Sequence, residues 1–304
     1  MVDLAFVGLG GMGSRLARRL LNSGYRVTGY NRTVQKAREL IPMGLRVAAT
    51  PREAATNADA VFTMVSDNTA LLAVTLGPDG VIAGLRRGAT LVEMSTVGPD
   101  VTRQLGELVT ARGAYLLDAP VSGSTVSVEQ GVASIQVGGD AAVLERVRPY
   151  LLAMGPNGVT HVGPLGLAKA MKVATNLGVA VQILAFCEAV LLAEKSGVPR
   201  EAAVDALMRS VIASPLVKYR GPFVVGKMAA HVAFPVEMIQ KDLQLALDQA
   251  RAVGVPLPTT ALTQEWLTKA RALGDDDRDF AKVFDVLAAM CGAPPAPLAQ
   301  EGVR

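Results

Sequence analysis

The chain has 304 residues, of which 50% are hydrophobic and 19% charged, a length and composition typical of an ordered globular protein of about two domains. Its net charge of only +3, without a stripe of lysine and arginine, argues against a nucleic-acid partner. The two cysteines, Cys187 and Cys291, lie far apart and no Cys/His pair has the spacing of a zinc site, so we expect no metal and a reducing, cytoplasmic location.

Residues 2 to about 160 alternate short apolar runs with amphipathic stretches. This alternation is typical of βαβ units around a parallel sheet. The predicted strands are Asp3–Val7, Arg26–Tyr30, Ala60–Met64, Thr90–Met94, Tyr115–Ala119, Ser134–Gly138 and Thr160–Val162. Predicted helices begin near Gly11, Val34, Thr69 and Pro99, and a further helix spans Ala141–Met154. The first half of the chain is therefore predicted to be an α/β domain.

A glycine motif follows the first predicted strand, in the segment DLAFVGLGGMGSRLARRL. Gly8 permits a tight turn, Gly10 lets the backbone approach a pyrophosphate, and Gly13 allows the helix to pack closely on the strand. The helix N-terminus then faces the phosphates. This strand, turn and helix predict a Rossmann-type dinucleotide site that includes the intervening Leu9, Gly11 and Met12. A tight glycine turn without a ligand is the alternative.

The end of the second strand reads Asn31, Arg32 and Thr33. An NAD site usually has an acidic residue here, which accepts hydrogen bonds from the ribose 2′-hydroxyl. Without a carboxylate to repel a 2′-phosphate, Arg32 and Thr33 are suited to bind one, so we expect NADP, with NAD less favoured. Alternatively, Arg32 is a solvated arginine stacked on adenine.

Ser122, Gly123 and Ser124 follow a predicted strand. Ligands of open α/β sheets gather at the carboxyl ends of strands, and a glycine turn there can direct N–H groups and hydroxyls at a carboxylate. The sequence thus favours an acid substrate, although an ordinary Ser/Gly turn has the same composition. His161 and His231 have no partner spacing for a metal or a catalytic triad, and we interpret both as structural.

Beyond Gly163 strand-like runs disappear and long periodic segments predict an all-helical region, which begins with a helix of about 28 residues. Such a helix would be on the order of 40 Å long and would join domains or subunits. We therefore expect an NADP-binding domain over 1–163, a helical substrate and dimerisation domain over 164–295, and a tail over 296–304. The stretch Val173–Ala193 is long enough to cross a bilayer, but Asn176, Gln182 and Glu188 within it are costly in lipid, so we expect a buried core helix.

Lys172 and Asn176 are four residues apart on this helix, so both side chains project from one face. A buried lysine is costly unless it is paired or used, and burial disfavours the charged form of an amine. Lys172 is therefore a candidate general acid/base. The alternative is a lysine whose amine reaches solvent from the start of the helix.

Four further segments resemble one enzyme family. They are MSTVGP at 94–99, LLDAPVSGSTVSVEQG at 116–131, GPLGLAKAMKVATN at 163–176 and KDLQLALDQA from Lys241. With the glycine motif they resemble, in the same order and over nearly the whole chain, the β-hydroxyacid dehydrogenases, especially the 3-hydroxyisobutyrate dehydrogenase-like members and the NADPH-dependent glyoxylate and succinic semialdehyde reductases.

The resemblance implies a Rossmann domain followed by a helical domain, with the active site in the cleft between them. It implies that Lys172 is the acid/base and that Ser122, Gly123 and Asn176 hold the substrate. The further expected substrate contacts are Ser124 and Lys241, and the further expected cofactor contacts are Met64, Val65, Thr96 and Lys241. Departures from the family pattern at Ser124, Thr175 and Ala168 put the identity of the substrate in doubt more than the chemistry.

The expected reaction is hydride transfer between NADP(H) and a small β-hydroxy acid or its semialdehyde or keto counterpart, in a homodimer or homotetramer. An imine reductase shares this architecture but usually has another residue in place of Lys172. A 6-phosphogluconate dehydrogenase shares the lysine and asparagine but is considerably longer. A cofactor-binding scaffold that has lost catalysis is an alternative from another functional class.

Overall fold

The computed structural model of the chain describes residues 2–227 and 232–297. His231 and residues 298–304 of the predicted tail lie outside the described residues. Contacts divide the chain into two compact units, residues 1–172 and residues 173–304, which we call the N-terminal unit and the helical unit.

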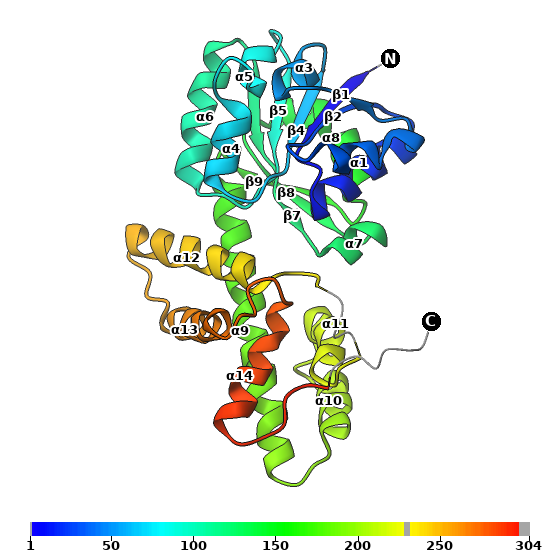
Figure 1. The fold of residues 1–304 in the computed structure, drawn as a ribbon. Helices are drawn as coiled ribbons and strands as arrows, with labels where there is room; N and C mark the ends of the chain where they lie inside the picture. The colour runs from blue at the N-terminus through cyan, green and yellow to red at the C-terminus, as the bar shows by residue number, and fades with distance from the viewer. Residues whose placement is uncertain (1, 228–231, 298–304) are drawn as a thin grey trace. The chain divides into compact units, whose positions relative to one another are not determined.

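The N-terminal unit is built on a mixed sheet flanked by helices (Figure 1). Its strands are β1 (Asp3–Val7), β2 (Arg26–Tyr30), β3 (Arg46–Val47), β4 (Ala60–Thr63), β5 (Thr90–Glu93), β6 (Tyr115–Asp118), β7 (Val121–Ser122), β8 (Ser134–Gly138) and β9 (Val159–Gly163). Its helices are α1 (Gly11–Asn22), α2 (Val34–Arg38), α3 (Pro51–Ala55), α4 (Asn68–Thr75), α5 (Val81–Gly84), α6 (Pro99–Ala111), α7 (Thr125–Glu129) and α8 (Ala141–Met154), with a 3-10 turn at Ile41–Met43.

The strand order is β3-β2-β1-β4-β5-β6-β8-β7, and β9 pairs with β8. The first six strands in this order are parallel to one another. By contrast, β8 is antiparallel to β6, and β7 is antiparallel to β8. The order reverses at β1, which pairs with β2 on one side and β4 on the other. In open α/β sheets this switch point is where ligands bind, at the carboxyl ends of the strands.

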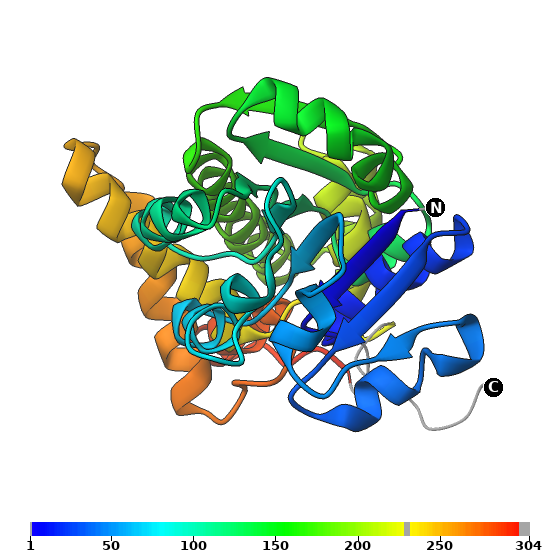
Figure 2. The same cartoon turned by 90° about the horizontal axis from the view of Figure 1, so that it is seen from above.

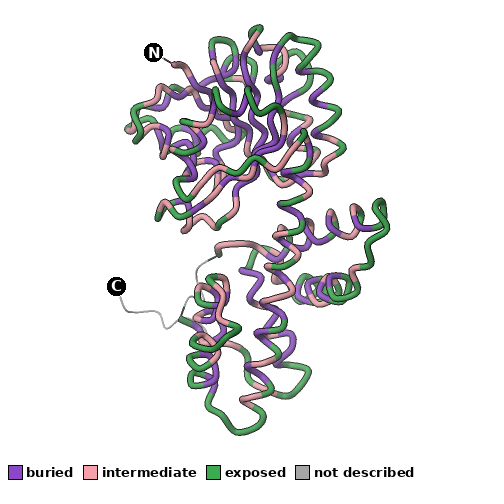
Figure 3. The backbone as a smooth tube through the Cα atoms, turned by 180° about the vertical axis from the view of Figure 1, so that it is seen from behind, coloured by how far each residue is buried: buried purple, intermediate pink, exposed green. Residues whose placement is uncertain are grey.

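The sheet is buried on both faces, as a parallel sheet requires. Along β1, Leu4 and Phe6 enter one hydrophobic core while Ala5 and Val7 enter the other. Helices α1 and α8 contribute to the first core, and α3 to α6 contribute to the second (Figures 1 and 2). Figure 3 shows that the strands at the centre of this unit are largely buried.

The predicted α/β fold of the first half is confirmed. The strands β1, β2 and β8 and the helix α8 have the predicted bounds, and α4 begins one residue before Thr69. For three strands the predicted C-terminal end is one residue too late: β4, β5 and β6 end at Thr63, Glu93 and Asp118. The short elements β3, α3, α5, β7 and α7 were not predicted, since none is long enough to show the periodic pattern of apolar residues that marks a helix or a strand.

The helical unit has no strand among its described residues, in agreement with the prediction. Its elements are the greater part of α9 (Leu167–Lys195), followed by α10 (Arg200–Arg209), α11 (Pro215–Val224), α12 (Val236–Val253), α13 (Pro258–Ala272), a 3-10 turn at Phe280–Lys282 and α14 (Val283–Met290). One hydrophobic core receives side chains from all of them.

Helix α9 is the one described helix that is long and apolar enough to span a bilayer. Within its most apolar window 44% of the residues are buried inside the protein, and a core helix of a soluble protein passes the same test. Polar side chains of α9 are also buried against protein partners, among them Lys169 and Asn176. These contacts are those of a helix packed in protein.

A buried ion pair joins α11 to the segment before α14. The guanidinium of Arg220 contacts the carboxylate of Asp279, and both side chains are at most 4% exposed. Asp279 also accepts hydrogen bonds from the backbone N–H groups of Ala233 and Phe234, at 2.9 and 3.1 Å. Arg220 lies 4.4 Å from the ring centroid of Phe280. The pair therefore holds Ala233 and Phe234, which directly precede α12, against the segment before α14.

Candidate functional site

The glycine turn after β1 has no room for side chains at two of its positions. Gly8 has φ +96°, and a Cβ there would lie 2.2 Å from the carbonyl oxygen of Met64. A Cβ at Gly13 would lie 1.9 Å from the carbonyl oxygen of Gly8. These two glycines therefore allow α1 to begin against β1 and the end of β4.

Gly10 differs, because no described atom of the N-terminal unit lies within 4 Å of a Cβ built on it. Gly10 is the N-cap of α1, and it provides no side-chain cap for the N–H groups of the first turn. This open backbone, with N–H donors at a helix N-terminus, fits the pyrophosphate of a dinucleotide. The residues present therefore fit the predicted cofactor.

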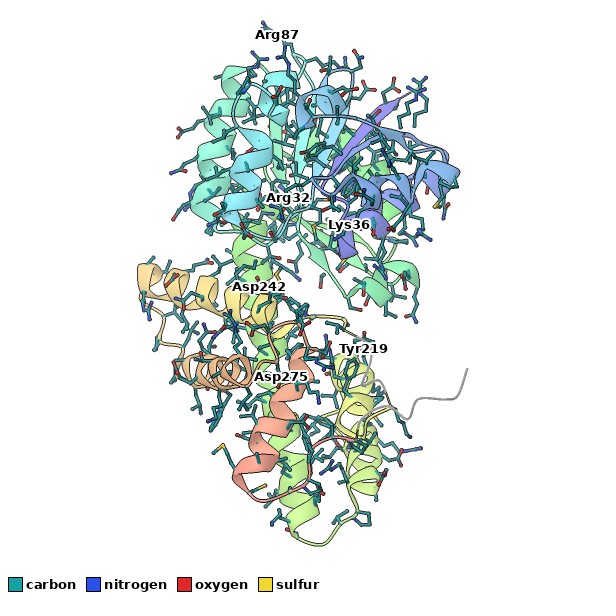
Figure 4. All side chains as sticks on the ribbon, viewed as in Figure 1. Arg32, Lys36, Arg87, Tyr219, Asp242 and Asp275 are labelled. Atoms are coloured by element: carbon teal, nitrogen blue, oxygen red, sulfur yellow. The ribbon has the colours of Figure 1, made fainter. Side chains whose placement is uncertain are left out.

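The predicted 2′-phosphate residues follow β2. The side chain of Asn31 accepts a hydrogen bond from Leu9 N at 2.8 Å and donates one to Thr33 O at 2.9 Å. Its amide therefore holds the glycine turn against the loop. Arg32 and Thr33 are exposed, and so is Lys36 on α2, a second cation that the sequence analysis missed (Figure 4).

The other expected cofactor residues follow β4 and β5. Met64 N donates to Val7 O at 2.9 Å, which continues the pairing of β4 with β1 up to the glycine turn. Val65 N donates to Ser95 Oγ at 2.9 Å, so the segments after β4 and β5 are joined. Thr96 follows Ser95 directly. Met64, Val65 and Thr96 thus lie at the carboxyl edge of the sheet, where the strand order switches.

Ser122 ends β7, and Gly123 has φ +144°. Ser124 is the N-cap of α7, where it forms a capping box with Ser127. Its hydroxyl accepts a hydrogen bond from Ser127 N at 3.2 Å, and its own N–H donates to Ser127 Oγ at 3.1 Å. Ser124 therefore has a local structural role, whereas Ser122 and Gly123 precede the cap and are not part of it.

The start of α9 carries Lys172, which is 9% exposed and is the last residue of the N-terminal unit. One turn earlier lies Lys169, which is fully buried and forms an ion pair with Glu93 at 2.5 Å. Asp118 accepts hydrogen bonds from the backbone N–H groups of Gly166 and Lys169. Lys169, Glu93 and Asp118 were not predicted from the sequence, because the partners of Lys169 lie 51 to 76 residues away in the chain.

In the helical unit, Asn176 on α9 meets the start of the KDL segment on α12. Asn176 Nδ2 donates to the carboxylate of Asp242 at 2.5 Å, and Lys241 Nζ lies 2.8 Å from the other oxygen of that carboxylate. Asp242 is 1% exposed and Asn176 3%. Figure 4 labels Asp242 on α12. The structure therefore brings Asn176 and Lys241 together through Asp242, which the sequence analysis did not select.

The remaining predicted features lie elsewhere. His161 is in β9, where its ring nitrogen Nε2 is 2.8 Å from Gly139 O, a contact that fits a structural role. The described residues contain no group of three or more His, Cys, Asp or Glu side chains arranged to hold a metal. Both cysteines are free thiols.

Two family models match this chain and together cover most of it. Residues 3–163 match the NAD-binding domain of 6-phosphogluconate dehydrogenase. Residues 166–287 match the model described as NAD-binding of NADP-dependent 3-hydroxyisobutyrate dehydrogenase.

The chain is similar to full-length relatives. It is 32% identical to glyoxylate/succinic semialdehyde reductase 1 of Arabidopsis thaliana, over 94% of this chain and 98% of that protein. It is 35% identical to 2-hydroxy-3-oxopropionate reductase of Escherichia coli K12, over 95% and 98%. A solved structure of 3-hydroxyisobutyrate dehydrogenase from Mycobacterium tuberculosis with L-serine is 30% identical over 94% and 99%, with a TM-score of 0.82. The chain therefore belongs to the β-hydroxyacid dehydrogenase family of NAD(P)-dependent oxidoreductases.

Proposed function

We propose that this enzyme uses NADPH to reduce a small carboxylate-bearing aldehyde or keto acid, and that it catalyses the reverse oxidation of the corresponding hydroxy acid. The observation that carries the proposal is the position of Lys172, buried at the start of α9 and in the same compact unit as the glycine turn. The reductases from Arabidopsis and Escherichia coli support this substrate class, since their names specify glyoxylate, succinic semialdehyde and 2-hydroxy-3-oxopropionate.

A preference for NADP over NAD is part of the proposal. The loop after β2 offers the exposed Arg32 and Thr33 in place of a carboxylate, and Lys36 adds a second exposed cation on α2. A guanidinium binds a phosphate through two parallel hydrogen bonds, which a ribose hydroxyl cannot match. Asn31 contributes indirectly, because its side chain fixes the loop to the glycine turn.

Lys172 is proposed as the general acid/base. Bound NADP(H) would supply or accept the hydride at the reacting carbon. In reduction the ammonium of Lys172 donates a proton to the carbonyl oxygen, and in oxidation the neutral amine accepts the hydroxyl proton. The atoms balance, because one hydride and one proton convert the carbonyl to the alcohol.

The remaining polar residues would hold the substrate. Asp242 accepts one N–H of Asn176 and so fixes the amide, whose second N–H is proposed to hold the reacting oxygen. Ser122 and the N–H of Gly123 are proposed to bind the substrate carboxylate, with Lys241 as a further contact. Such positioning keeps the reacting atoms aligned for hydride transfer.

The alternatives make different predictions. An imine reductase usually has another residue in place of Lys172, so the presence of Lys172 favours carbonyl over imine chemistry. A cofactor-binding scaffold would bind NADPH stoichiometrically without oxidising it in the presence of any small aldehyde or keto acid.

We also propose a homo-oligomer, a dimer or a tetramer, in the cytoplasm. The helical unit exposes several large apolar side chains, among them Leu192 at 72%, Val253 at 66% and Leu273 at 61%. Burial of such side chains between copies of the chain would favour a symmetric assembly. A strictly monomeric mass in solution at micromolar concentration would contradict the assembly.

The function is tested with a substrate panel. NADPH and NADH oxidation is followed by nicotinamide absorbance with glyoxylate, succinic semialdehyde and tartronate semialdehyde, and the reverse reaction with 3-hydroxyisobutyrate, serine and threonate. We expect at least one of these acids to be turned over, with a higher kcat/KM for NADPH or NADP than for NADH or NAD. Tight NADPH binding without turnover of any member would favour the scaffold.

A further inference from the structure

Lys169 is a second buried lysine on α9, with no part in the chemistry proposed above. Its side chain is fully buried, and three oxygen atoms lie within 2.9 Å of its Nζ. They are the backbone oxygens of Glu93 and Ser95, at 2.9 and 2.6 Å, and Glu93 Oε2 at 2.5 Å. Two backbone hydrogen bonds and one ion-pair contact therefore hold the Lys169 amine in one position.

The partners of Lys169 belong to the segment proposed to line the cofactor. Glu93 ends β5, and its Oε1 accepts a hydrogen bond from Ser95 N at 2.7 Å. Ser95 Oγ in turn accepts one from Val65 N after β4. Val65 and Thr96 are proposed cofactor contacts, so the ammonium of Lys169 is bonded to the backbone directly beside them.

The other end of the network is the first turn of α9. Asp118, at the end of β6, accepts hydrogen bonds from Gly166 N at 2.8 Å and Lys169 N at 2.9 Å. A carboxylate at a helix N-terminus is favourable because of the helix dipole. Lys172 follows Lys169 by three residues, so both side chains leave the helix on neighbouring sides. The backbone N–H of Lys169 is thus bonded to the end of β6, and its side chain is bonded to the end of β5. These two attachments set the position of the helical turn that leads to Lys172.

The sheet does not need Lys169 for its own pairing. β5 is paired along its length with β4 on one side and β6 on the other. A buried ion pair, moreover, often contributes no more stability than apolar residues of similar volume would. The network is therefore better explained by the geometry it imposes than by the stability it adds.

We propose that Lys169 is a positioning residue for the reaction: it joins the cofactor-lining segments after β4 and β5 to the first turn of α9, and thereby holds Lys172 in place for proton transfer. This inference rests on the proposed role of Lys172 as the acid/base. A displacement of about 1 Å at a reacting group can reduce the rate about a hundredfold, so the loss of this connection affects turnover even where the fold persists.

Two variants separate positioning from folding. Lys169→Met leaves the carboxylate of Glu93 buried and unpaired, and is expected to lower Tm. The double variant Glu93→Gln with Lys169→Met removes both charges, while the amide oxygen of the glutamine still accepts from Ser95 N. Arg200→Met is the matched control, because it breaks a largely buried pair with Glu194 in the helical unit, at a distance of 2.9 Å in the parent.

The readouts are Tm, the Kd for NADPH, kcat, KM and the effect of D2O on kcat. The double variant is expected to fold and still to bind NADPH, since the glycine turn and Arg32 are unchanged, with a modest rise in Kd because the segments that carry Val65 and Thr96 lose one attachment. Its kcat should fall about tenfold to a hundredfold. Its solvent isotope effect should rise, because proton delivery by a misplaced Lys172 limits the rate. The isotope effect is a ratio and does not depend on the fraction of folded enzyme.

Arg200→Met should lower Tm while keeping the kcat and the isotope effect of the parent. The proposal is overturned if the double variant keeps the parent kcat and isotope effect. It is also overturned if neither Lys169 variant folds and binds NADPH, since the pair would then be required for folding alone. Lys172→Ala is measured in parallel: if it retains the parent kcat, the proposed acid/base role fails, whereas a loss there with an active double variant refutes only the role of Lys169.

Discussion

Comparing Gly10→Ala with Gly13→Ala distinguishes a glycine that leaves room for a ligand from a glycine that the fold requires. A Cβ at Gly10 meets no described atom of the N-terminal unit within 4 Å, and the φ of −71° suits alanine. At Gly13 a Cβ would lie 1.9 Å from Gly8 O, well inside the 3.0 Å that real Cβ contacts require. Gly13→Ala should therefore destabilise the fold by about 1 to 3 kcal/mol, whereas Gly10→Ala should not.

The same reasoning gives the effect on the cofactor. If a pyrophosphate lies against the turn, the methyl group of Gly10→Ala meets it, and about 1 to 3 kcal/mol of overpacking raises the Kd for NADPH about fivefold to 150-fold. Thermal unfolding without cofactor and fluorescence titration with NADPH measure the two effects separately. Gly178→Ala, an open position on α9, is the control and should keep the parent Kd. Parent affinity in Gly10→Ala would refute the placement of the cofactor.

Three further predictions concern other parts of the chain. Arg32→Ala should weaken NADP binding about tenfold to 150-fold while sparing NAD, as expected for the loss of a charge-assisted hydrogen bond; equal losses for both cofactors in titrations would contradict it. Arg220→Ala should lower the free energy of unfolding by about 3 to 5 kcal/mol because a buried carboxylate loses its partner, whereas the exposed Arg209→Ala should change it by less than about 0.5 kcal/mol in the same denaturant titration. Burial raises the pKa of the Cys187 thiol, so a thiol reagent should modify only the exposed Cys291 in the native protein and both cysteines in denaturant.

Much of the fold was predictable because it depends on local patterns. The strand β1, the glycine turn and α1 follow one another within 20 residues, and each has its own composition signal. The long apolar segment predicted the helix α9 for the same reason. Short elements such as β3 and α3 lack that signal, because two to five residues cannot display a period, and their structure depends on pairing with β2 and packing on the sheet.

The candidate site was predictable only in part. The Gly10 turn and Lys172 belong to motifs that can be read along the chain. Lys169 looks like an ordinary helix residue in sequence, and only the fold brings it to Glu93, 76 positions earlier. Asp242 lies beside Lys241 in the KDL segment, yet nothing in the sequence indicates that its carboxylate accepts a hydrogen bond from Asn176, 66 positions away. Such contacts depend on the packing of distant segments.

The most direct test of the central claim is the kcat of Lys172→Ala at saturating NADPH, on the best substrate of the panel and across the pH range. Removing a positioned acid/base typically costs about 10² to 10⁴ in rate, so kcat should fall by that factor while the Kd for NADPH stays that of the parent. A Lys172→Ala enzyme that keeps near-parent kcat at every pH would contradict the assignment of Lys172 as the proton donor and acceptor.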